Sequence, residues 1–165
     1  TRRFLEGYGG HPTAAGFTVK EENFNNFRKT FLHYSKERLT EAELVQTIVL
    51  EGEIYLKDIN SRFMTFLNKL EPYGPGNMRP KFAIRNIIIA GNPKVIGNGD
   101  HLKFKIRQGK TVYGAIGFNM SQYYEKLIKG CPLDIACLVE INEWRGQESI
   151  QLNVRDIKLS EKSYD

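Results

Sequence analysis

The pattern of hydrophobic and polar positions separates a helical stretch near the start of the chain from a strand-rich remainder. Apolar positions recur every three or four residues over 20–38, which predicts an amphipathic helix. Its aromatic stripe, which we expect to be core, consists of Phe24, Phe27, Phe31 and Tyr34. Residues 47–56 are typical of a strand in which Gly52 could form a bulge. Asp58 is expected to cap a second helix, which must end by Pro72.

From Pro80 onward the pattern predicts three strands, a short helix and two more strands. The predicted strands cover 82–90, 101–108, 111–118, 133–142 and 148–158. Turns are expected at 91–93 and 97–100, and a hairpin across Gly109-Lys110. Asn119, with Gln122 three residues later, is expected to open the short helix, which Gly130 closes. This order is that of an OB-fold, a small barrel that binds oligonucleotides, although other one-helix barrels share it.

Composition fits this reading of a mostly β chain with some helix (α+β). The 165 residues are 41% hydrophobic and 26% charged, and no apolar run approaches the roughly 20 residues of a membrane span. We therefore expect no membrane contact. The two cysteines form no CxxC pair, which argues against a disulfide framework or a zinc site and favours a reducing, cytoplasmic setting. Residues 39–46 are expected to join two units, 1–45 and 46–165, with the core barrel at 80–158 and a strand-helix lead-in at 46–71.

The net charge of +5 is concentrated in one window. Residues 79–110 hold eight basic side chains and a single acidic one. Within 101–107 the pattern alternates, so that three apolar residues face the barrel interior and His101, Lys103, Lys105 and Arg107 face outward, about 6.5–7 Å apart. A polyanion such as single-stranded DNA could follow this row, and a tyrosine ring on the neighbouring strand could stack on a base. The candidate nucleic-acid-binding residues are Arg79, Lys81, His101, Lys103, Lys105, Arg107, Tyr113 and Arg155; the alternative is an ordinary solvated strand face.

Residues 9–16 (Gly-Gly-His-Pro-Thr-Ala-Ala-Gly) form the second candidate site. Glycines can adopt conformations that other residues avoid, which would let main-chain N–H groups face an anion. His11 beside Gly9 and Gly10 could donate a hydrogen bond to a phosphate. The alternative is a tight turn with a surface histidine. Only eight residues precede the octet, and the chain does not begin with Met, so we expect it to be part of a longer protein.

Two motifs resemble known families. The octet resembles the GGHxxAAG signature of the DHH-associated domain of DHH phosphoesterases and alanyl-tRNA synthetases. Residues 70–77 (Leu-Glu-Pro-Tyr-Gly-Pro-Gly-Asn), which are expected to form a rigid loop, resemble a motif of the RecJ family of bacterial single-strand-specific exonucleases. The residues around 101–103 and 151–157 are also similar to that family. The resemblance implies that 1–45 is the end of a DHH-associated α/β domain and that an OB domain follows it.

The same resemblance implies a function. Gly9, Gly10 and His11 would hold the substrate phosphate in the active site of a 5′-to-3′ exonuclease of DNA repair and recombination, and the OB domain would grip single-stranded DNA. The Asp-His-His motif and the aspartates that bind Mn²⁺ or Mg²⁺ in this family are absent, so we expect this chain alone to hold no metal and cleave nothing. A single-strand-binding protein or a helicase is a candidate partner. The alternatives are another DHH phosphoesterase such as an oligoribonuclease, or the accessory domain of a tRNA synthetase; a free-standing OB module; and a protein-interaction barrel.

Overall fold

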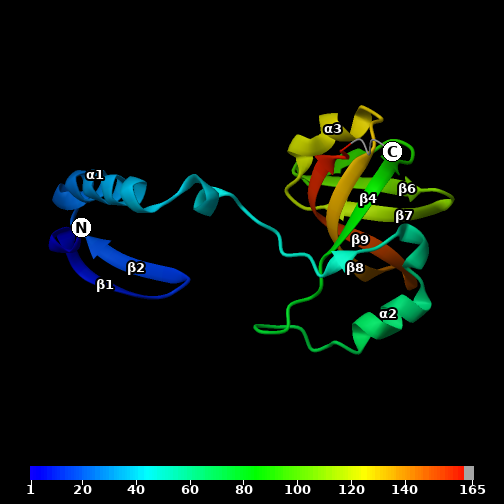
Figure 1. The fold of residues 1–165 in the computed structure, drawn as a ribbon, viewed down its shortest axis with the longest axis horizontal. Helices are drawn as coiled ribbons and strands as arrows, with labels where there is room; N and C mark the ends of the chain where they lie inside the picture. Colours follow the sequence, from blue (N-terminus) through cyan, green and yellow to red (C-terminus); the bar gives the residue numbers. More distant parts are fainter. Residues whose placement is uncertain (162–165) are drawn as a thin grey trace. The chain divides into compact units, whose positions relative to one another are not determined.

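The computed structural model describes residues 1–161 and divides the chain into two compact units, Thr1–Thr47 and a second unit from Ile48. The first unit is a two-stranded antiparallel hairpin with one long helix (Figure 1). Its elements are η1 (Arg2–Phe4), β1 (Leu5–His11), β2 (Ala14–Val19), α1 (Glu21–Arg38) and η2 (Glu41–Leu44).

Helix α1 confirms the predicted helix, but most of its aromatic stripe is exposed. Phe27 is buried, with its ring centroid 4.8 Å from that of Phe17 and 5.7 Å from that of Phe31. Phe24, Phe31 and Tyr34 each remain about half exposed. The expectation that the whole stripe is core is therefore wrong for the described chain, because a two-stranded hairpin is too narrow to cover it.

The second unit is a closed β-barrel. Its strands are β3 (Gly52–Glu53), β4 (Phe82–Ile89), β5 (Lys94–Ile96), β6 (His101–Gln108), β7 (Thr111–Gly117), β8 (Leu133–Trp144) and β9 (Gln147–Leu159). They follow the order β3-β4-β8-β9-β7-β6-β5, and an additional pairing of β4 with β6 closes five of them into a ring. Strands β7 and β9 pair in parallel, and the other ring pairings are antiparallel. This arrangement confirms the predicted OB-fold.

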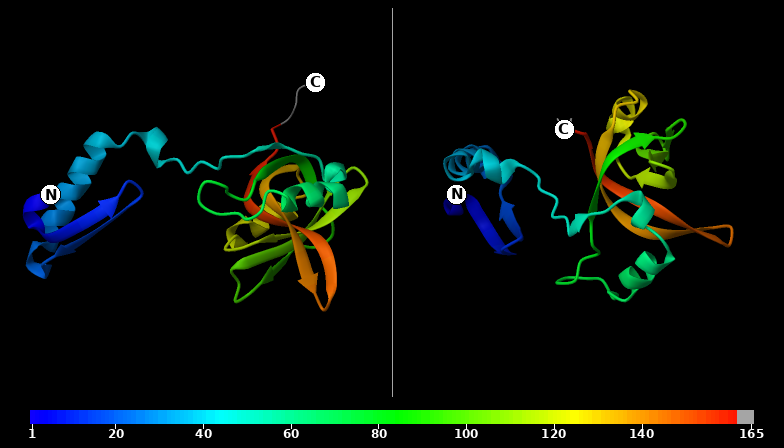
Figure 2. Two further views of the ribbon diagram at one scale, coloured as in Figure 1. Left: turned by 90° about the horizontal axis from the view of Figure 1, so that it is seen from below. Right: turned by 45° about the vertical axis from the view of Figure 1, so that its right-hand side comes forward.

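Helices cover the two ends of the ring. The helical elements are η3 (Leu56–Asp58), α2 (Ser61–Asn68), η4 (Ser121–Tyr123) and α3 (Tyr124–Ile128). Helix α2 lies at one end and α3 at the other (Figure 1), and the hairpin of β8 and β9 extends beyond the ring (Figure 2). No helix within residues 1–161 is long and apolar enough to span a bilayer.

The core forms because alternate residues of each strand point into the ring. On β6 the inward residues Leu102, Phe104 and Ile106 are buried, while Lys103, Lys105 and Arg107 between them are exposed. The predicted facing of this strand is therefore confirmed. Because the inward row is apolar and closely packed, the backbone beneath the outward row is held rigidly.

Several local predictions are wrong. The expected strand 47–56 is reduced to Gly52–Glu53, which pairs in parallel with β4 and carries no bulge; the chain then turns into η3 at Leu56. Asn60, not Asp58, caps α2: its side-chain oxygen accepts a hydrogen bond from the Phe63 amide at 3.0 Å. The Asp58 carboxylate instead accepts one from the Tyr55 amide at 3.3 Å.

Two further differences lie near the outer face of β6. Strand β5 was not predicted, because its three residues fall between two turns. Asn119 does not cap the short helix; its φ of 54° is in the left-handed region, and the 3-10 turn begins two residues later at Ser121. Its amide donates instead to His101 Nδ1 at 3.1 Å.

Candidate nucleic-acid interface

A row of positive charge lies on the outer face of β6. Lys103, Lys105 and Arg107 are exposed and occupy alternate positions of the strand. Strand β5 places Lys94 directly opposite Lys103, which widens the row by one strand. None of these four side chains forms an ion pair with another residue of 1–161. Their charge is therefore available to an anionic ligand.

A groove runs beside this row. Its volume is about 640 Å³, and its lining includes Lys94, Lys103 and Lys105, with Gly114 on β7 and Gln151 on β9. Residues 90–92, which precede β5, also line it, as do Phe104 and Ala115. We call this feature the basic groove. Lys94 and Gly114 were not among the predicted site residues. Lys94 belongs to β5, which was not predicted. A glycine within a strand indicates only that some other group could approach the backbone closely, and does not say which.

His101 and Tyr113 have structural roles in the described chain. His101 is half-buried, accepts the Asn119 hydrogen bond through Nδ1 and packs edge-on against Phe118, with ring centroids 5.2 Å apart. Tyr113 pairs with the inward residue Ile106, packs on the core and donates its hydroxyl hydrogen bond to the Ile59 carbonyl. The prediction that Tyr113 faces outward is therefore wrong. The outward positions of β7 are Val112, Gly114 and Ile116, opposite Arg107, Lys105 and Lys103 respectively.

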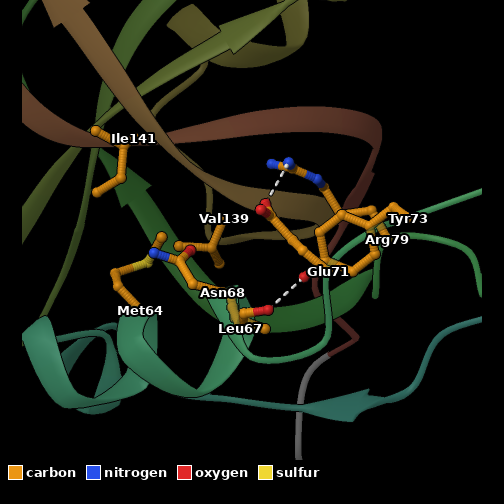
Figure 3. A pocket seen from close by; sticks show the side chains of 8 residues that line it. All are labelled: Met64, Leu67, Asn68, Glu71, Tyr73, Arg79, Val139 and Ile141. Atoms are coloured by element: carbon orange, nitrogen blue, oxygen red, sulfur yellow. Dashed lines mark hydrogen bonds and ion pairs between the residues drawn. The ribbon is translucent and has the colours of Figure 1, made fainter.

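Arg79 lies in a separate cavity formed by the 70–77 loop, α2 and β8 (Figure 3). The cavity has a volume of about 260 Å³. Arg79 lies 3.5 Å from the Glu71 carboxylate and 3.7 Å from that of Glu140, and its guanidinium lies 4.8 Å from the centre of the Tyr73 ring. Because two acids and a ring already surround it, its charge is less available than that of the β6 row.

Hydrogen bonds hold the 70–77 loop in one shape, as expected. Gly74 and Asn77 exchange two backbone hydrogen bonds of 2.9 Å. The Asn77 side-chain amide donates to the carbonyls of Leu70 (2.7 Å) and Pro72 (2.9 Å). The Tyr73 hydroxyl donates to the Leu67 carbonyl at 2.7 Å (Figure 3). The loop therefore fixes α2 to the chain that enters β4.

The remaining predicted residues of the barrel are dispersed. Lys81 is half-buried just before β4, and Arg155 is exposed on β9 beside the register shift opposite Ala136 and Cys137. Asn153, two residues before Arg155, is buried; its side-chain amide donates to Glu140 at 3.1 Å, and its Oδ1 has no hydrogen-bond partner within residues 1–161. The structure thus brings Lys103, Lys105 and Arg107 together and leaves Lys81, Arg79 and Arg155 outside the basic groove.

Asp134 is a buried carboxylate with a structural role. It accepts hydrogen bonds from the Ser160 hydroxyl (2.5 Å), the Asn86 amide (3.1 Å) and Arg85 Nη1 (3.3 Å). A hydrogen bond from Arg85 Nε to Glu53, at 2.7 Å, and the nearby charges of Glu53 and Asp134 raise the pKa of the arginine. These contacts join β4, β8 and the end of β9.

The octet forms the tip of the β1–β2 hairpin. Gly9 and Gly10 lie in β1 and His11 ends it, opposite Ala14. None of the octet glycines has a left-handed φ, so the expected anion-binding turn conformation is absent from this hairpin. Gly10 is instead required by close approach, since a Cβ there would lie 2.7 Å from the Ala14 carbonyl oxygen. His11 is exposed, so its ring is free to meet a ligand.

The described residues do not fit a catalytic metal centre. Within residues 1–161 no three His, Cys, Asp or Glu side chains lie close enough together to hold a metal ion. A two-metal centre needs several such ligands, and the exposed His11 stands alone. The hairpin could therefore contact a phosphate but supplies no metal ligand set of its own.

The matching family model and the curated relatives agree on one family. The family model "RecJ OB domain" matches residues 50–156. The single-stranded-DNA-specific exonuclease RecJ of Bacillus subtilis is 29% identical over 160 residues, which are 97% of this chain and 20% of that protein. RecJ of Haemophilus influenzae is 33% identical over 152 residues, 89% of this chain and 26% of that protein. The chain thus spans about a fifth to a quarter of these curated relatives.

A solved structure shows the same fold. The crystal structure of RecJ from Thermus thermophilus in complex with Mn²⁺ covers 98% of this chain and 23% of that protein, with a TM-score of 0.74 and 23% sequence identity. A second structure of that protein, in complex with Mg²⁺, has a TM-score of 0.68.

Proposed function

The chain belongs to the RecJ OB domain family, and from that premise we propose that its barrel binds single-stranded DNA for an exonuclease of the RecJ type. The observation that carries the proposal is the basic groove, continued along β6 by Arg107. Outward residues of a strand repeat every 6.5–7 Å or so, and a backbone of phosphates can follow such a row. A groove of positive charge on an OB barrel is a common way of binding single strands with little sequence preference.

The proposal extends to a longer protein, since the relatives are about three and a half to five times the length of this chain. That protein would be a metal-dependent 5′-to-3′ exonuclease of the cytoplasm, acting in DNA repair and recombination. Its ion would be Mn²⁺ or Mg²⁺, as in the Thermus thermophilus structures, held by residues other than 1–161. When bound, such an ion activates water and stabilises the leaving oxygen. This chain alone would not cleave DNA. A single-strand-binding protein or a helicase would be a suitable partner.

The first unit would contribute to the active site of that protein as the end of a DHH-associated domain, followed by the OB domain from about residue 46. Gly9 and Gly10 present backbone without side chains next to the exposed His11. In the proposal this tip contacts the phosphate at the scissile bond, with the His11 ring as hydrogen-bond donor. The basic groove holds the strand and the hairpin takes part in the chemistry.

The test is a salt series of fluorescence anisotropy with a labelled single strand of about 20 nucleotides. We expect salt-sensitive binding that exceeds duplex binding. Changing Lys103, Lys105 and Arg107 together to Ala should weaken it and lower the slope of log K against log salt by about 0.7 per lost phosphate contact, or about 2 in all.

The matched control removes three positive charges elsewhere in the same unit. Lys57, Arg62 and Lys69, changed together to Ala, lie outside the basic groove beside the rings of Tyr55 and Phe66. If the two triple variants weakened binding equally, the net charge of the unit would explain the binding, and the position of the β6 row would not matter. No binding of the unmodified chain at low salt would favour a protein-interaction barrel.

A further inference from the structure

Gly114 leaves a bare spot in the middle of the outer barrel face. It lies within β7, opposite Lys105 of β6 on one side and Gln151 of β9 on the other. Neighbouring strands are about 4.8 Å apart, so these two flanking residues are separated by roughly 9.5 Å of sheet. Between them only backbone covers the floor of the basic groove.

The fold itself does not require this glycine. Its φ is outside the left-handed region, and a Cβ built there would meet nothing within 4 Å. Gly117 of the same strand differs, since a Cβ there would lie 2.8 Å from the sulfur of Met120. A glycine inside a strand costs roughly 0.5–1 kcal/mol relative to alanine. In strands such positions often mark the close approach of a ligand.

The surroundings of Gly114 suit a flat ring with polar edges. Along β7 the neighbouring outward residues are Val112 and Ile116, both apolar. Across the strand, the Gln151 carboxamide offers a donor and an acceptor and makes no hydrogen bond to another residue of 1–161. Lys94, Lys103 and Lys105 line the other side of the groove. The spot therefore combines a floor of bare backbone between two apolar residues, a hydrogen-bonding edge and a cationic edge.

We infer that Gly114 is the seat of one nucleobase of the bound single strand. The base lies flat on the bare backbone, its edge meets the Gln151 carboxamide, and the adjoining phosphates contact the lysines. A side chain at position 114 would occupy the volume of the ring. The inference rests on the proposed function and names the subsite at which a base, as distinct from the phosphate backbone, contributes to binding.

The test fills the spot in the 165-residue chain. Gly114→Val should fold with an unchanged or higher melting temperature, because its Cβ meets no atom and valine favours strands. Its affinity for a 20-nucleotide single strand should fall about 5-fold, the low end of the range for a base stacked on an aromatic ring, because Gly114 offers backbone and no ring; the salt slope should stay that of the unmodified chain. Gly52→Val is the matched control, since a Cβ there also meets nothing within 4 Å and Gly52 lies outside the basic groove.

A second probe separates base from backbone. The same oligonucleotide with abasic sites keeps every phosphate, so the unmodified chain should bind it more weakly than the normal probe. Gly114→Val should bind the two probes alike. Gln151→Leu, which leaves the floor open, should lose affinity for the normal probe alone.

The outcomes distinguish the two proposals. If the unmodified chain binds no single strand, the proposed function fails and the base subsite with it. If the unmodified chain binds but Gly114→Val binds equally well, the base subsite is wrong and the proposed function stands. If Gly114→Val weakens both probes by the same factor, the sugar-phosphate backbone crosses Gly114 instead, and the base subsite is again wrong.

Discussion

Cys137 is a titratable group enclosed by the barrel core. It lies on β8 with no exposed surface, and burial raises the pKa of its thiol to about 12. In the unfolded chain the thiol ionises near its ordinary pKa of about 8.5–9. Because the folded pKa is the higher one, the thiol's contribution to stability is complete below about pH 8.5 and is lost as the pH rises toward 12.

This linkage gives a prediction for pH-dependent unfolding in a Cys131→Ser background, which leaves Cys137 as the single thiol. At pH 7, Cys137→Ala should lower the free energy of unfolding by about 1 kcal/mol through lost packing. Between pH 9 and 10.5 that difference should shrink and reverse, at about 1.4 kcal/mol per pH unit, because the unfolded thiolate stabilises only the parent chain. Denaturant titrations at several pH values measure it. A constant difference would mean that the thiol ionises equally in both states.

Residue type alone did not reveal which polar side chains are free. Lys103, Lys105 and Arg107 alternate with large apolar residues on β6, so the sequence predicted their facing. Tyr113 was assigned to the wrong face because its strand carries small or apolar residues on both faces, so the sequence pattern does not indicate which face points into the barrel. His101 looked like part of the basic row, and its bond to the Asn119 amide depends on a left-handed turn that no periodicity encodes.

Among the elements, the 70–77 loop shows how one side chain can hold irregular backbone. The Asn77 amide bridges two carbonyls, those of Leu70 and Pro72, which would otherwise need water. We expect Asn77→Ala to lower the free energy of unfolding by about 1 kcal/mol. This is the low end of the range for the loss of two hydrogen bonds, because the site is exposed and water can replace them. Asn77→Asp should cost at least as much, since a carboxylate cannot donate. The control in thermal unfolding is Asn68→Ala, since Asn68 is an exposed residue of the cavity whose side chain makes no hydrogen bond to another residue of 1–161. An equal loss of stability there would contradict the bridging role of Asn77.

Elements with a long apolar alternation were predicted well, and those fixed by distant partners were not. Strands β4, β6 and β7 and the hairpin of β8 and β9 lie within about two residues of their predicted bounds. β5 is a strand because Lys94, Val95 and Ile96 pair with the start of β6, a long-range contact invisible in three residues. Residues 47–56 show the opposite error: their apolar run predicted a strand, but only two of these residues pair with β4. The basic groove was half predicted for the same reason: its β6 side follows from alternation, and Lys94 depends on β5.

At the scale of the whole molecule, the two candidate sites lie on different compact units. The octet belongs to the first unit and the basic groove to the second. In a full-length protein that contains this chain, mutations should therefore affect DNA binding and catalysis separately. A group that acts mainly in the transition state lowers kcat, whereas a group that binds substrate and transition state equally changes KM.

The last prediction uses this separation in that full-length protein with its divalent ion. His11→Ala should lower kcat for single-strand digestion by about 100-fold or more, the effect of losing one donor to a transition-state phosphate, with little change in DNA affinity. The Lys103, Lys105 and Arg107 triple Ala variant should raise KM and recover most of its rate at saturating DNA. His33→Ala is the control histidine, since His33 is an exposed residue of the same unit that pairs with Glu37. Equal losses of rate and affinity in His11→Ala would make His11 a simple binding residue, and the octet would then contribute to DNA binding and not to catalysis.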